Sequence, residues 1–373
     1  MKIVVDENMP HACELFAEFG EVVPLPGRQI GAADLRDADV LLVRSVTRVD
    51  AGLLADCPRL GFVGTATIGT DHIDTALLAE RGIPFFSAPG CNKYSVGDYV
   101  LSALLVLAER HELSLDQMSL AVIGAGNTGE CVAGKAEALG MRVLRCDPPR
   151  ARLEGAAGFV DYPTALSADI VSFHVPLTRE GQDATFHLLG EREIAALPKG
   201  QFLINASRGE VWDNQALLAR QQSDQPLRLV MDVWEGEPEP LKALVPHTEL
   251  ATPHIAGYSL EGKARGTWML YQALCQQLGR MPRQDLQSLL PAPEVRELTP
   301  GQPADQGLIK QLVHLIYDVR RDDARFRNRI GVPGSFDGQR KDYPERRELS
   351  SLQVSGPFAC DRLARLGFAI SQK

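Results

Sequence analysis

Residues 119–147 read SLAVIGAGNTGECVAGKAEALGMRVLRCD. The apolar run at the start is typical of a buried strand, and the segment after the glycines has the spacing of an amphipathic helix. Between them lies the pattern GxGxxG, whose glycines permit a tight turn, close approach of a ligand to the backbone and close packing of helix on strand. The start of such a helix also offers free N–H groups and a partial positive charge to a phosphate. The stretch therefore predicts a strand–turn–helix unit of a parallel α/β sheet that binds a pyrophosphate.

The end of this stretch indicates which dinucleotide would bind. A second predicted strand, Met141 to Cys146, ends at Asp147, 18 residues after Gly129. A carboxylate there can accept hydrogen bonds from an adenosine ribose and would repel the additional phosphate of NADP. Arg150 follows closely enough to weaken that preference. A GxGxxG pattern alone is better explained as a plain glycine turn, but the strand, the helix and the acid together favour an NAD site.

An alternation of short apolar runs and amphipathic segments covers residues 1–285. It predicts two α/β domains with Rossmann-like or flavodoxin-like parallel sheets and a cleft between them. Two long helices are expected at the seams, over residues 95–111 and 259–278, and a proline-rich stretch over 289–303 separates a small α+β tail. The predicted substrate-binding (lid) domain covers residues 1–94 and is completed by residues 258–285. The predicted NAD-binding Rossmann domain covers residues 95–257, and the predicted C-terminal domain covers residues 286–373.

The composition excludes several classes of function. The chain has 373 residues, with 39 Lys or Arg against 48 Asp or Glu, and the net charge of −9 is a poor balance for a nucleic-acid or anionic-membrane binder. The start, MKIVVDENMP, carries two acidic residues where a secretion signal needs an apolar core, and the longest uncharged apolar run, Tyr99 to Ala108, is too short to span a membrane. The seven cysteines are scattered without a CxxC pair. We therefore expect a cytoplasmic protein with no metal site and no nucleic-acid or membrane partner.

Three later segments place polar residues directly after predicted strands, where doubly wound sheets bind their ligands: NASRG at 205–209, DVWEGEP at 232–238 and TPHIAG at 252–257. Arg208 can hold a carboxylate with its planar fork. His254 can accept a hydroxyl proton while a hydride leaves the same carbon, and Glu237 can orient the imidazole. Taken singly, these could be a surface ion pair, a buried structural histidine and a loop acid. Their joint occurrence after a dinucleotide motif favours a hydride-transfer site with these three as catalytic residues.

With VGTATIGTDHID at residues 63–74, these blocks and their order resemble the D-isomer-specific 2-hydroxyacid dehydrogenases over about residues 1–285. The resemblance implies the catalytic residues that chemistry also singles out, Arg208, Glu237 and His254. It implies substrate contacts at Ser45, Thr67 and Tyr258, and the charge of Arg44 makes that residue a further, weaker candidate. The glycine turn and the resemblance together indicate cofactor contacts at Gly124, Gly126, Asn127, Thr128, Gly129, Asp147, Val175, Ala206, Ser207, Arg208, Asp232 and Gly257.

Further segments resemble one branch of that family in particular. KIVVDENMP, LLVRSVTRVD, APGCN and the tail segment FDGQRKDYPERRE are similar to the branch that oxidises 4-phospho-D-erythronate to (R)-3-hydroxy-2-oxo-4-phosphobutanoate with NAD, an early step of pyridoxal 5′-phosphate biosynthesis. Such a substrate offers a carboxylate to Arg208, a 2-hydroxyl to His254 and a phosphate to Arg44 or Ser45. The resemblance also implies that the C-terminal domain forms a homodimer.

Two residues differ from those common in the resembled family, and two other functions stay open. Val175 stands where relatives often have threonine, so only a backbone contact is expected there, and Lys93 replaces the small residue common after Asn92. The chain could instead be another D-2-hydroxyacid dehydrogenase, acting on phosphoglycerate or glycerate. It could also be an NAD-sensing binding protein of the corepressor kind, because a fold alone does not fix a function.

Overall fold

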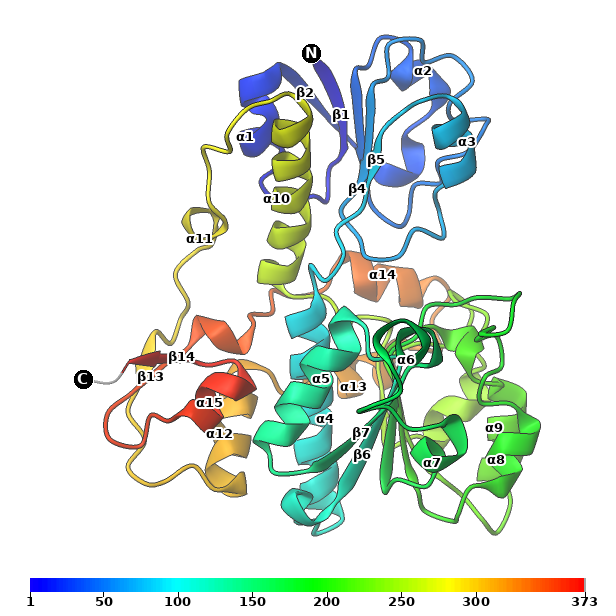
Figure 1. The fold of residues 1–373 in the computed structure, drawn as a ribbon, viewed down its shortest axis with the longest axis vertical. Helices are drawn as coiled ribbons and strands as arrows, with labels where there is room; N and C mark the ends of the chain where they lie inside the picture. Colours follow the sequence, from blue (N-terminus) through cyan, green and yellow to red (C-terminus); the bar gives the residue numbers. More distant parts are fainter. Residues whose placement is uncertain (372–373) are drawn as a thin grey trace. The chain divides into compact units, whose positions relative to one another are not determined.

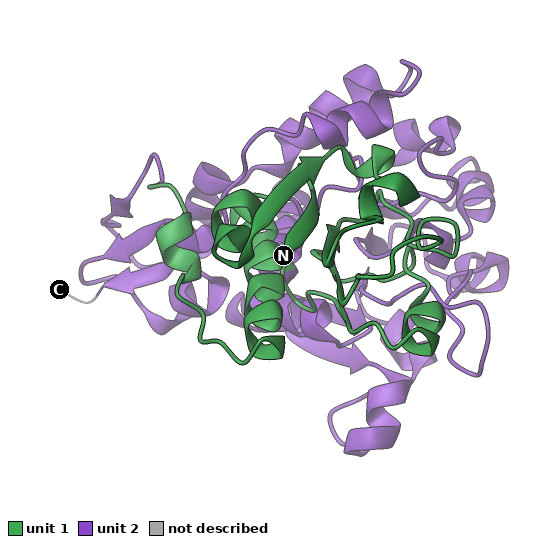
Figure 2. Ribbon diagram, turned by 90° about the horizontal axis from the view of Figure 1, so that it is seen from above, with its two compact units in different colours: residues 1–92, 259–292 green, residues 93–258, 293–373 purple. Residues whose placement is uncertain are grey.

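The computed structural model describes residues 1–371, which group into two compact units. Unit 1 contains residues 1–92 and 259–292, and unit 2 contains residues 93–258 together with the chain from 293 onward (Figure 2). Over the described residues the strands form three sheets, and all of their strand pairs are parallel. The predicted α/β fold class with a small C-terminal α+β part is confirmed.

Unit 1 is built on a five-stranded sheet with the order β2-β1-β3-β4-β5 (Figure 1). Its strands are β1 (Lys2–Asp6), β2 (Glu21–Leu25), β3 (Val40–Val43), β4 (Phe62–Thr65) and β5 (Phe85–Phe86). Its helices are α1 (Ala12–Phe16), α2 (Ala32–Leu35), α3 (Thr75–Glu80), α10 (Leu260–Gln277) and α11 (Leu286–Leu289), with 3₁₀ turns η1 (Ala17–Phe19) and η2 (Gly27–Gln29).

Apolar side chains on both faces hold the unit 1 sheet between helices. One face packs against α1 and α10, where Phe16 and Tyr271 meet edge to face with their ring centroids 6.1 Å apart. The other face packs against α2 and α3 through Leu35 and Leu78. A strand that is buried on both faces has a continuous apolar sequence, such as VLLV in β3. Such runs predict the strands from the sequence.

Unit 2 contains a six-stranded sheet with the order β11-β10-β9-β8-β6-β7 (Figure 1). Its strands are β6 (Ser119–Ile123), β7 (Arg142–Cys146), β8 (Ile170–Phe173), β9 (Phe202–Asn205), β10 (Arg228–Met231) and β11 (Leu250–Ala251). Its helices are α4 (Lys93–Arg110), α5 (Asn127–Ala138), α6 (Pro148–Glu154), α7 (Tyr162–Leu166), α8 (Glu191–Ala196) and α9 (Asn214–Gln221), with η3 (Leu115–Gln117), η4 (Gly209–Val211) and η5 (Lys242–His247). Strands β7 and β8 lie on opposite sides of β6, so the order of the strands in the sheet reverses at β6. Sheets of this kind bind ligands at the carboxyl end of the strands at such a reversal.

Residues 293–371, here called the C-terminal module, pack onto unit 2. The module contains α12 (Gln306–Ile316), α13 (Val319–Arg329), α14 (Ser335–Lys341), η6 (Leu349–Ser351), α15 (Asp361–Leu366) and a small sheet of β12 (Glu297–Leu298), β13 (Gln353–Ser355) and β14 (Ala369–Ser371). Leu308 and Leu312 of α12 and Leu363 of α15 join the same core as α4 and α5. The module therefore shares a hydrophobic core with the six-stranded sheet.

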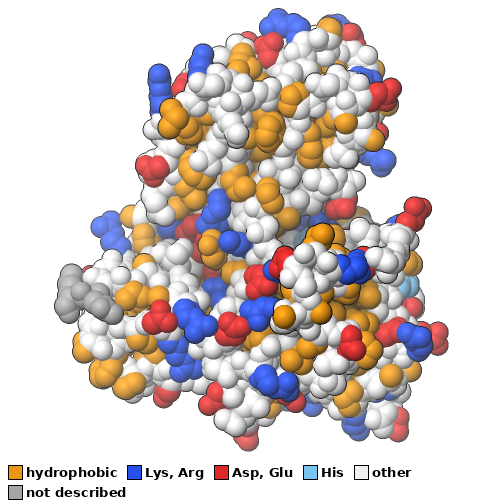
Figure 3. Space-filling model, viewed as in Figure 1, with side chains coloured by type: hydrophobic (Ala, Val, Ile, Leu, Met, Phe, Trp, Pro, Cys, Tyr) orange, Lys and Arg blue, Asp and Glu red, His pale blue; other side chains and the backbone are white. Residues whose placement is uncertain are grey.

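The two units can be compared with the three domains predicted from the sequence. Residues 259–292 return to unit 1, and the C-terminal module groups with unit 2 rather than standing apart as a third unit. The assignment of substrate, cofactor and dimerisation roles to these parts stays a prediction. Within residues 1–371, no helix has both the length and the apolar content needed to cross a membrane. On the face drawn in Figure 3, basic and acidic side chains are interspersed.

Candidate active site

The glycine-rich turn joins β6 to α5 and fits a dinucleotide phosphate. Gly124 has φ +86°, and a Cβ there would lie 2.8 Å from the carbonyl oxygen of His174. A Cβ at Gly129 would lie 2.0 Å from the carbonyl oxygen of Gly124, so helix and strand meet more closely than any larger residue permits. Gly126 precedes the helix without a side-chain cap and has nothing within 4 Å of its Cβ position. The first N–H groups of α5 therefore lie beside open space, as binding of a pyrophosphate requires.

A cavity of about 630 Å³ opens at this turn. Its wall includes Gly126 and Asn127 from the turn, Lys93 from the start of α4, Arg150 from α6 and Arg365 from the C-terminal module. The carboxylates of Glu130 and Glu154 also line the cavity, so the N–H groups at the start of α5 and the basic side chains are the groups that can bind the phosphates of a dinucleotide.

Asp147 directly follows β7 and connects the end of this strand to the glycine turn. Its Oδ2 accepts a hydrogen bond from the Ala125 N–H at 2.9 Å, and its Oδ1 accepts one from the Arg150 N–H at 3.0 Å. The Arg150 guanidinium is paired with Glu130 and Glu154, each at 2.8 Å. Since this arginine is already neutralised by two carboxylates, the local charge beside Asp147 favours a ribose hydroxyl over an additional phosphate.

The loops after β10 and β11 bring Glu237 and His254 together. The Nδ1 atom of His254 lies 2.7 Å from Oε2 of Glu237, whose Oε1 accepts a hydrogen bond from the Trp234 N–H at 2.9 Å. Burial alone would raise the pKa of Glu237, but the charge of His254, the hydrogen bond to its ring and the Trp234 N–H outweigh burial and hold that pKa below its ordinary value. An ionised Glu237 fixes the proton of a neutral imidazole on Nδ1, which leaves Nε2 as a proton acceptor.

A buried aspartate shapes the backbone around His254. Oδ1 of Asp232 accepts hydrogen bonds from the Thr252 hydroxyl at 2.6 Å and the Ile255 N–H at 2.8 Å, and Oδ2 accepts one from the Ala256 N–H at 2.9 Å. His254 itself adopts φ +57°, and its N–H donates to the Asp232 carbonyl oxygen at 2.6 Å. A left-handed conformation is uncommon for a side chain of this size, and it persists here because the neighbouring N–H groups are all engaged.

Arg208 lies in the loop after β9, directly beside the loop that carries Glu237. A Cβ at Gly209 would lie 1.9 Å from the carbonyl carbon of Trp234, so the two loops touch backbone to backbone. Asn205 supports this loop, since its Oδ1 accepts hydrogen bonds from the Ser207 N–H and hydroxyl and its amide donates to the Arg208 carbonyl oxygen. The side chain of Arg208 is half-buried. The carboxyl ends of three neighbouring strands thus supply a cation, a carboxylate and an imidazole.

Known proteins share the sequence and the fold. Residues 106–256 match the family model described as the NAD binding domain of D-isomer specific 2-hydroxyacid dehydrogenases, and residues 289–367 match a domain of unknown function. An erythronate-4-phosphate dehydrogenase of Aeromonas salmonicida is 85% identical over 99% of both chains, and one of Tolumonas auensis is 62% identical over the full length of both. The chain belongs to the erythronate-4-phosphate dehydrogenases of the D-isomer-specific 2-hydroxyacid dehydrogenase family.

Solved structures agree with the fold of this family. The TT0316 protein of Thermus thermophilus aligns with a TM-score of 0.65 at 26% identity, covering 76% of this chain and 99% of that one. A D-lactate dehydrogenase of Aquifex aeolicus, complexed with NAD and lactic acid, aligns with a TM-score of 0.61 at 24% identity, over 75% and 96% of the two chains. The predicted family, the enzymatic character and the NAD cofactor are confirmed.

The C-terminal module contributes a residue that the sequence analysis missed. Arg340, on α14, places its guanidinium carbon 5.9 Å from the ring centroid of Tyr258. Burial would lower the pKa of Arg340, but the phenol of Tyr258 and the carboxylates of Glu237 and Asp337 outweigh it and raise that pKa. This dehydrogenase therefore has a fourth charged group near its Glu237–His254 pair. Arg340 lies 103 residues after Glu237, in the tail segment FDGQRKDYPERRE, and that segment alone does not indicate that the arginine lies near the catalytic pair.

The remaining predicted substrate residues, Arg44, Ser45 and Thr67, belong to unit 1. Arg44 and Ser45 follow β3, Arg44 half-buried and Ser45 exposed. Thr67 follows β4, and its hydroxyl lies 2.8 Å from that of Thr65 and donates to the Gly69 carbonyl oxygen at 2.9 Å. Both loops lie at the carboxyl edge of the unit 1 sheet, where ligand contacts are expected.

Among the predicted cofactor residues, Val175 follows β8 and faces the glycine turn, since a Cβ at Gly124 would lie 2.7 Å from its Cγ1 atom. Ala206 and Gly257 are half-buried in the loops after β9 and β11, and Ser207 is buried. Their contacts with the cofactor stay predictions, as does the expectation that the protein has no metal site.

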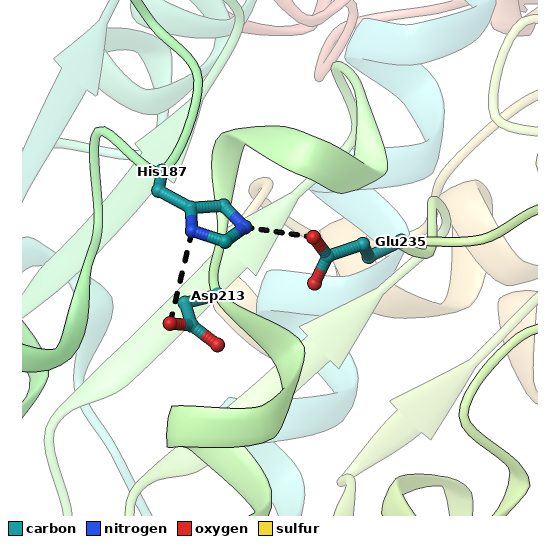
Figure 4. Close-up of side chains that lie close together, drawn as sticks. All are labelled: His187, Asp213 and Glu235. Atoms are coloured by element: carbon teal, nitrogen blue, oxygen red, sulfur yellow. Dashed lines mark hydrogen bonds and ion pairs between the residues drawn. The ribbon is translucent and has the colours of Figure 1, made fainter.

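A cluster of His187, Asp213 and Glu235 could supply metal ligands (Figure 4). Nε2 of His187 lies 2.7 Å from Glu235, whereas its Nδ1 faces Asp213 at 3.7 Å. The two carboxylates face different ring nitrogens, and one donor atom from each of the three residues lies within 4.8 Å of the others. Asp213 also caps α9, and Glu235 accepts the Asn214 N–H, so the cluster fastens the start of this helix to the loop that holds Glu237.

The contact between Gly209 and Trp234 predicts a large effect of a single methyl group. In Gly209→Ala, the two loops must separate, and we expect the free energy of unfolding to fall by about 2–4 kcal/mol, measured by urea denaturation. Gly134→Ala is the matched control, because this α5 glycine has nothing within 4 Å of its Cβ position and the change should be neutral or stabilise by roughly 0.5–1 kcal/mol. Equal stability of the two variants would contradict the proposed close contact.

Proposed function

We propose that this enzyme oxidises 4-phospho-D-erythronate to (R)-3-hydroxy-2-oxo-4-phosphobutanoate with NAD, an early step toward pyridoxal 5′-phosphate. The observation that carries the proposal is the 2.7 Å contact between Glu237 and His254, with the Arg208 loop against the same Trp234 backbone. The relatives with 85% and 62% identity bear the name of this activity. The proposal therefore combines a hydride-transfer geometry with a specific substrate.

The roles of the three residues follow from their chemistry. Arg208 binds the substrate carboxylate through its planar fork, which fixes the neighbouring C2 carbon. Nε2 of His254 accepts the proton of the 2-hydroxyl as the C2–O bond becomes a carbonyl, and Glu237 stabilises the resulting imidazolium. When bound, NAD accepts the C2 hydrogen with its electron pair. Each proton and electron pair of the oxidation then has an acceptor.

The cofactor is held by the residues that the sequence indicated. The turn from Gly124 to Gly129 and the start of α5 bind the pyrophosphate, and Asp147 accepts hydrogen bonds from the adenosine ribose. Val175 contributes its backbone. The further contacts come from the loops after β9, β10 and β11, at Ala206, Ser207, Arg208, Asp232 and Gly257, while substrate contacts come from Ser45, Thr67, Tyr258 and Arg44.

The substrate is tested by comparing acids that differ in one feature. Purified enzyme with NAD is offered 4-phospho-D-erythronate, 3-phospho-D-glycerate and D-erythronate, and NADH formation is followed, with the reverse reaction as a check on product inhibition. We expect the highest kcat/KM for 4-phospho-D-erythronate. Preference for another acid would keep the mechanism and overturn the substrate, and NAD binding without turnover in either direction would favour a binding protein.

The role of His254 is tested by His254→Gln. We expect turnover to fall about 10²- to 10⁴-fold, because a general base is lost, whereas the Kd for NAD changes by no more than about twofold. His247→Gln, at an exposed histidine of η5, is the control and should leave both quantities unchanged. A parallel loss of turnover and NAD binding in His254→Gln would indicate a structural role instead.

We also infer a cytoplasmic homodimer formed through the C-terminal module. This inference rests on the family resemblance of the tail segment FDGQRKDYPERRE, which implies a dimerisation module. Sedimentation velocity of the full chain at micromolar concentration should give twice the chain mass of 40.7 kDa. A single species with the mass of one chain would argue against the dimer.

A further inference from the structure

Two loops of unit 1 come together at the carboxyl edge of its sheet. Strands β3 and β4 are neighbours in parallel register, with Val43 opposite Thr65, and the Ala66 N–H donates to the Val43 carbonyl oxygen at 2.9 Å. Arg44 and Ala66, the next residues along each strand, therefore leave the sheet side by side. Ser45 and Thr67 follow them in the same two loops.

Helix α10 covers this edge at close range. A Cβ at Gly266 would lie 2.8 Å from the carbonyl oxygen of Ala66, so the helix rests on the loop after β4. Lys263 precedes Gly266 by three residues and thus occupies the same face of the helix, one turn nearer its start. The side chain of Lys263 is half-buried, which is unusual for a lysine.

Lys263 and Arg44 both lie at this edge of unit 1. Burial first, and then the charge of Arg44, lower the pKa of Lys263 to about 8. Lys263 also lies in the first turn of an 18-residue helix, where the helix dipole disfavours a cation. An anion bound at this edge would be attracted by both side chains.

We propose that Lys263, together with Arg44 and Ser45, binds the phosphate group of the substrate and thereby sets the preference for a phosphorylated 2-hydroxy acid. The inference rests on the proposed function and identifies the residue that distinguishes a phosphate monoester from the free alcohol. A protonated lysine beside an arginine and a hydroxyl supplies the charged donors that a phosphate dianion accepts.

Other charged and titratable groups lie on the elements that meet here. Asp6 ends β1, and its Oδ1 accepts the Asn8 N–H at 2.8 Å. His72 follows β4, with its Nε2 atom 3.0 Å from the Thr65 hydroxyl. Arg265, on α10, donates to the Cys91 carbonyl oxygen, and the buried Glu261 lies in the first turn of the same helix. Because these groups could also change substrate binding with pH, the experiment must compare two substrates that differ only in the phosphate.

The first test uses the unmodified enzyme. The ratio of kcat/KM for 4-phospho-D-erythronate to that for D-erythronate is measured from pH 7 to pH 9.5, because effects of His254 on the common chemistry cancel in the ratio. The phosphate is already a dianion over this range. Since burial and the charge of Arg44 lower the pKa of Lys263 to about 8, we expect the ratio to fall about tenfold over this range. A ratio that stays constant with pH would overturn the proposal.

Two variants separate charge from shape. Lys263→Met should lower the ratio about 10- to 100-fold at pH 7 and remove its pH dependence, as expected for the loss of one charged hydrogen bond. Lys263→Arg should keep a high ratio up to pH 9.5, because a guanidinium does not titrate there. Lys199→Met, at an exposed lysine of unit 2, is the matched control. A ratio for Lys263→Met within twofold of the unmodified value would reject the assignment.

A binding measurement distinguishes failure of this inference from failure of the proposed reaction. The Kd of 4-phospho-D-erythronate is measured by calorimetry on the NADH complex of each form. Weaker binding in Lys263→Met by the same 10- to 100-fold supports the phosphate site even if the unmodified enzyme prefers another substrate in turnover. Equal Kd values in the two forms reject the site, whatever the turnover results.

Discussion

The arrangement of the catalytic residues depends on the buried carboxylate of Asp232. A carboxylate away from water is strongly unfavourable unless its oxygens accept hydrogen bonds, and here they accept three, from Thr252, Ile255 and Ala256. Burial raises the pKa of Asp232, and the charge of His254 and these hydrogen bonds oppose that effect. The same bonds fold the chain back around His254 and hold its ring against Glu237. Cofactor contact by Asp232 stays a prediction, but its role in shaping this loop is direct.

The C-terminal module supports the same loop from the other side. Arg346 is buried, stacks on Tyr317 at 3.5 Å from the ring centroid and donates to the carbonyl oxygens of Ser95, Ile255 and Ala256. Thus Asp232 accepts from the N–H groups of residues 255 and 256, and Arg346 donates to their carbonyl oxygens. The backbone N–H and carbonyl groups of residues 255 and 256 are all hydrogen-bonded within the protein, and these bonds hold the loop that follows His254 in place.

An aromatic series links this module to the Glu237 loop as well. Trp234 lies 5.7 Å from Phe326 of α13, which meets Phe336 of α14 edge to face at 6.0 Å, measured between ring centroids. The helix that carries Phe336 also carries Arg340. Packing of these rings therefore fixes where the additional charge lies relative to the catalytic pair. Arg346 is buried, and most of the Arg340 side chain is also removed from solvent.

The sequence by itself determined the α/β class, the glycine turn with Asp147, and the candidate trio of Arg208, Glu237 and His254, because each is marked by a local pattern at a strand end. It also placed the two long helices within about two residues of their observed bounds, Lys93–Arg110 and Leu260–Gln277, since their apolar spacing is long and regular. Only the tertiary structure decided which residues far apart in the chain share an environment. Arg340 and Arg346 lie in the tail segment FDGQRKDYPERRE, and Lys263 belongs to no motif, but the chemistry of all three arises from burial and from charges that neighbouring elements bring close.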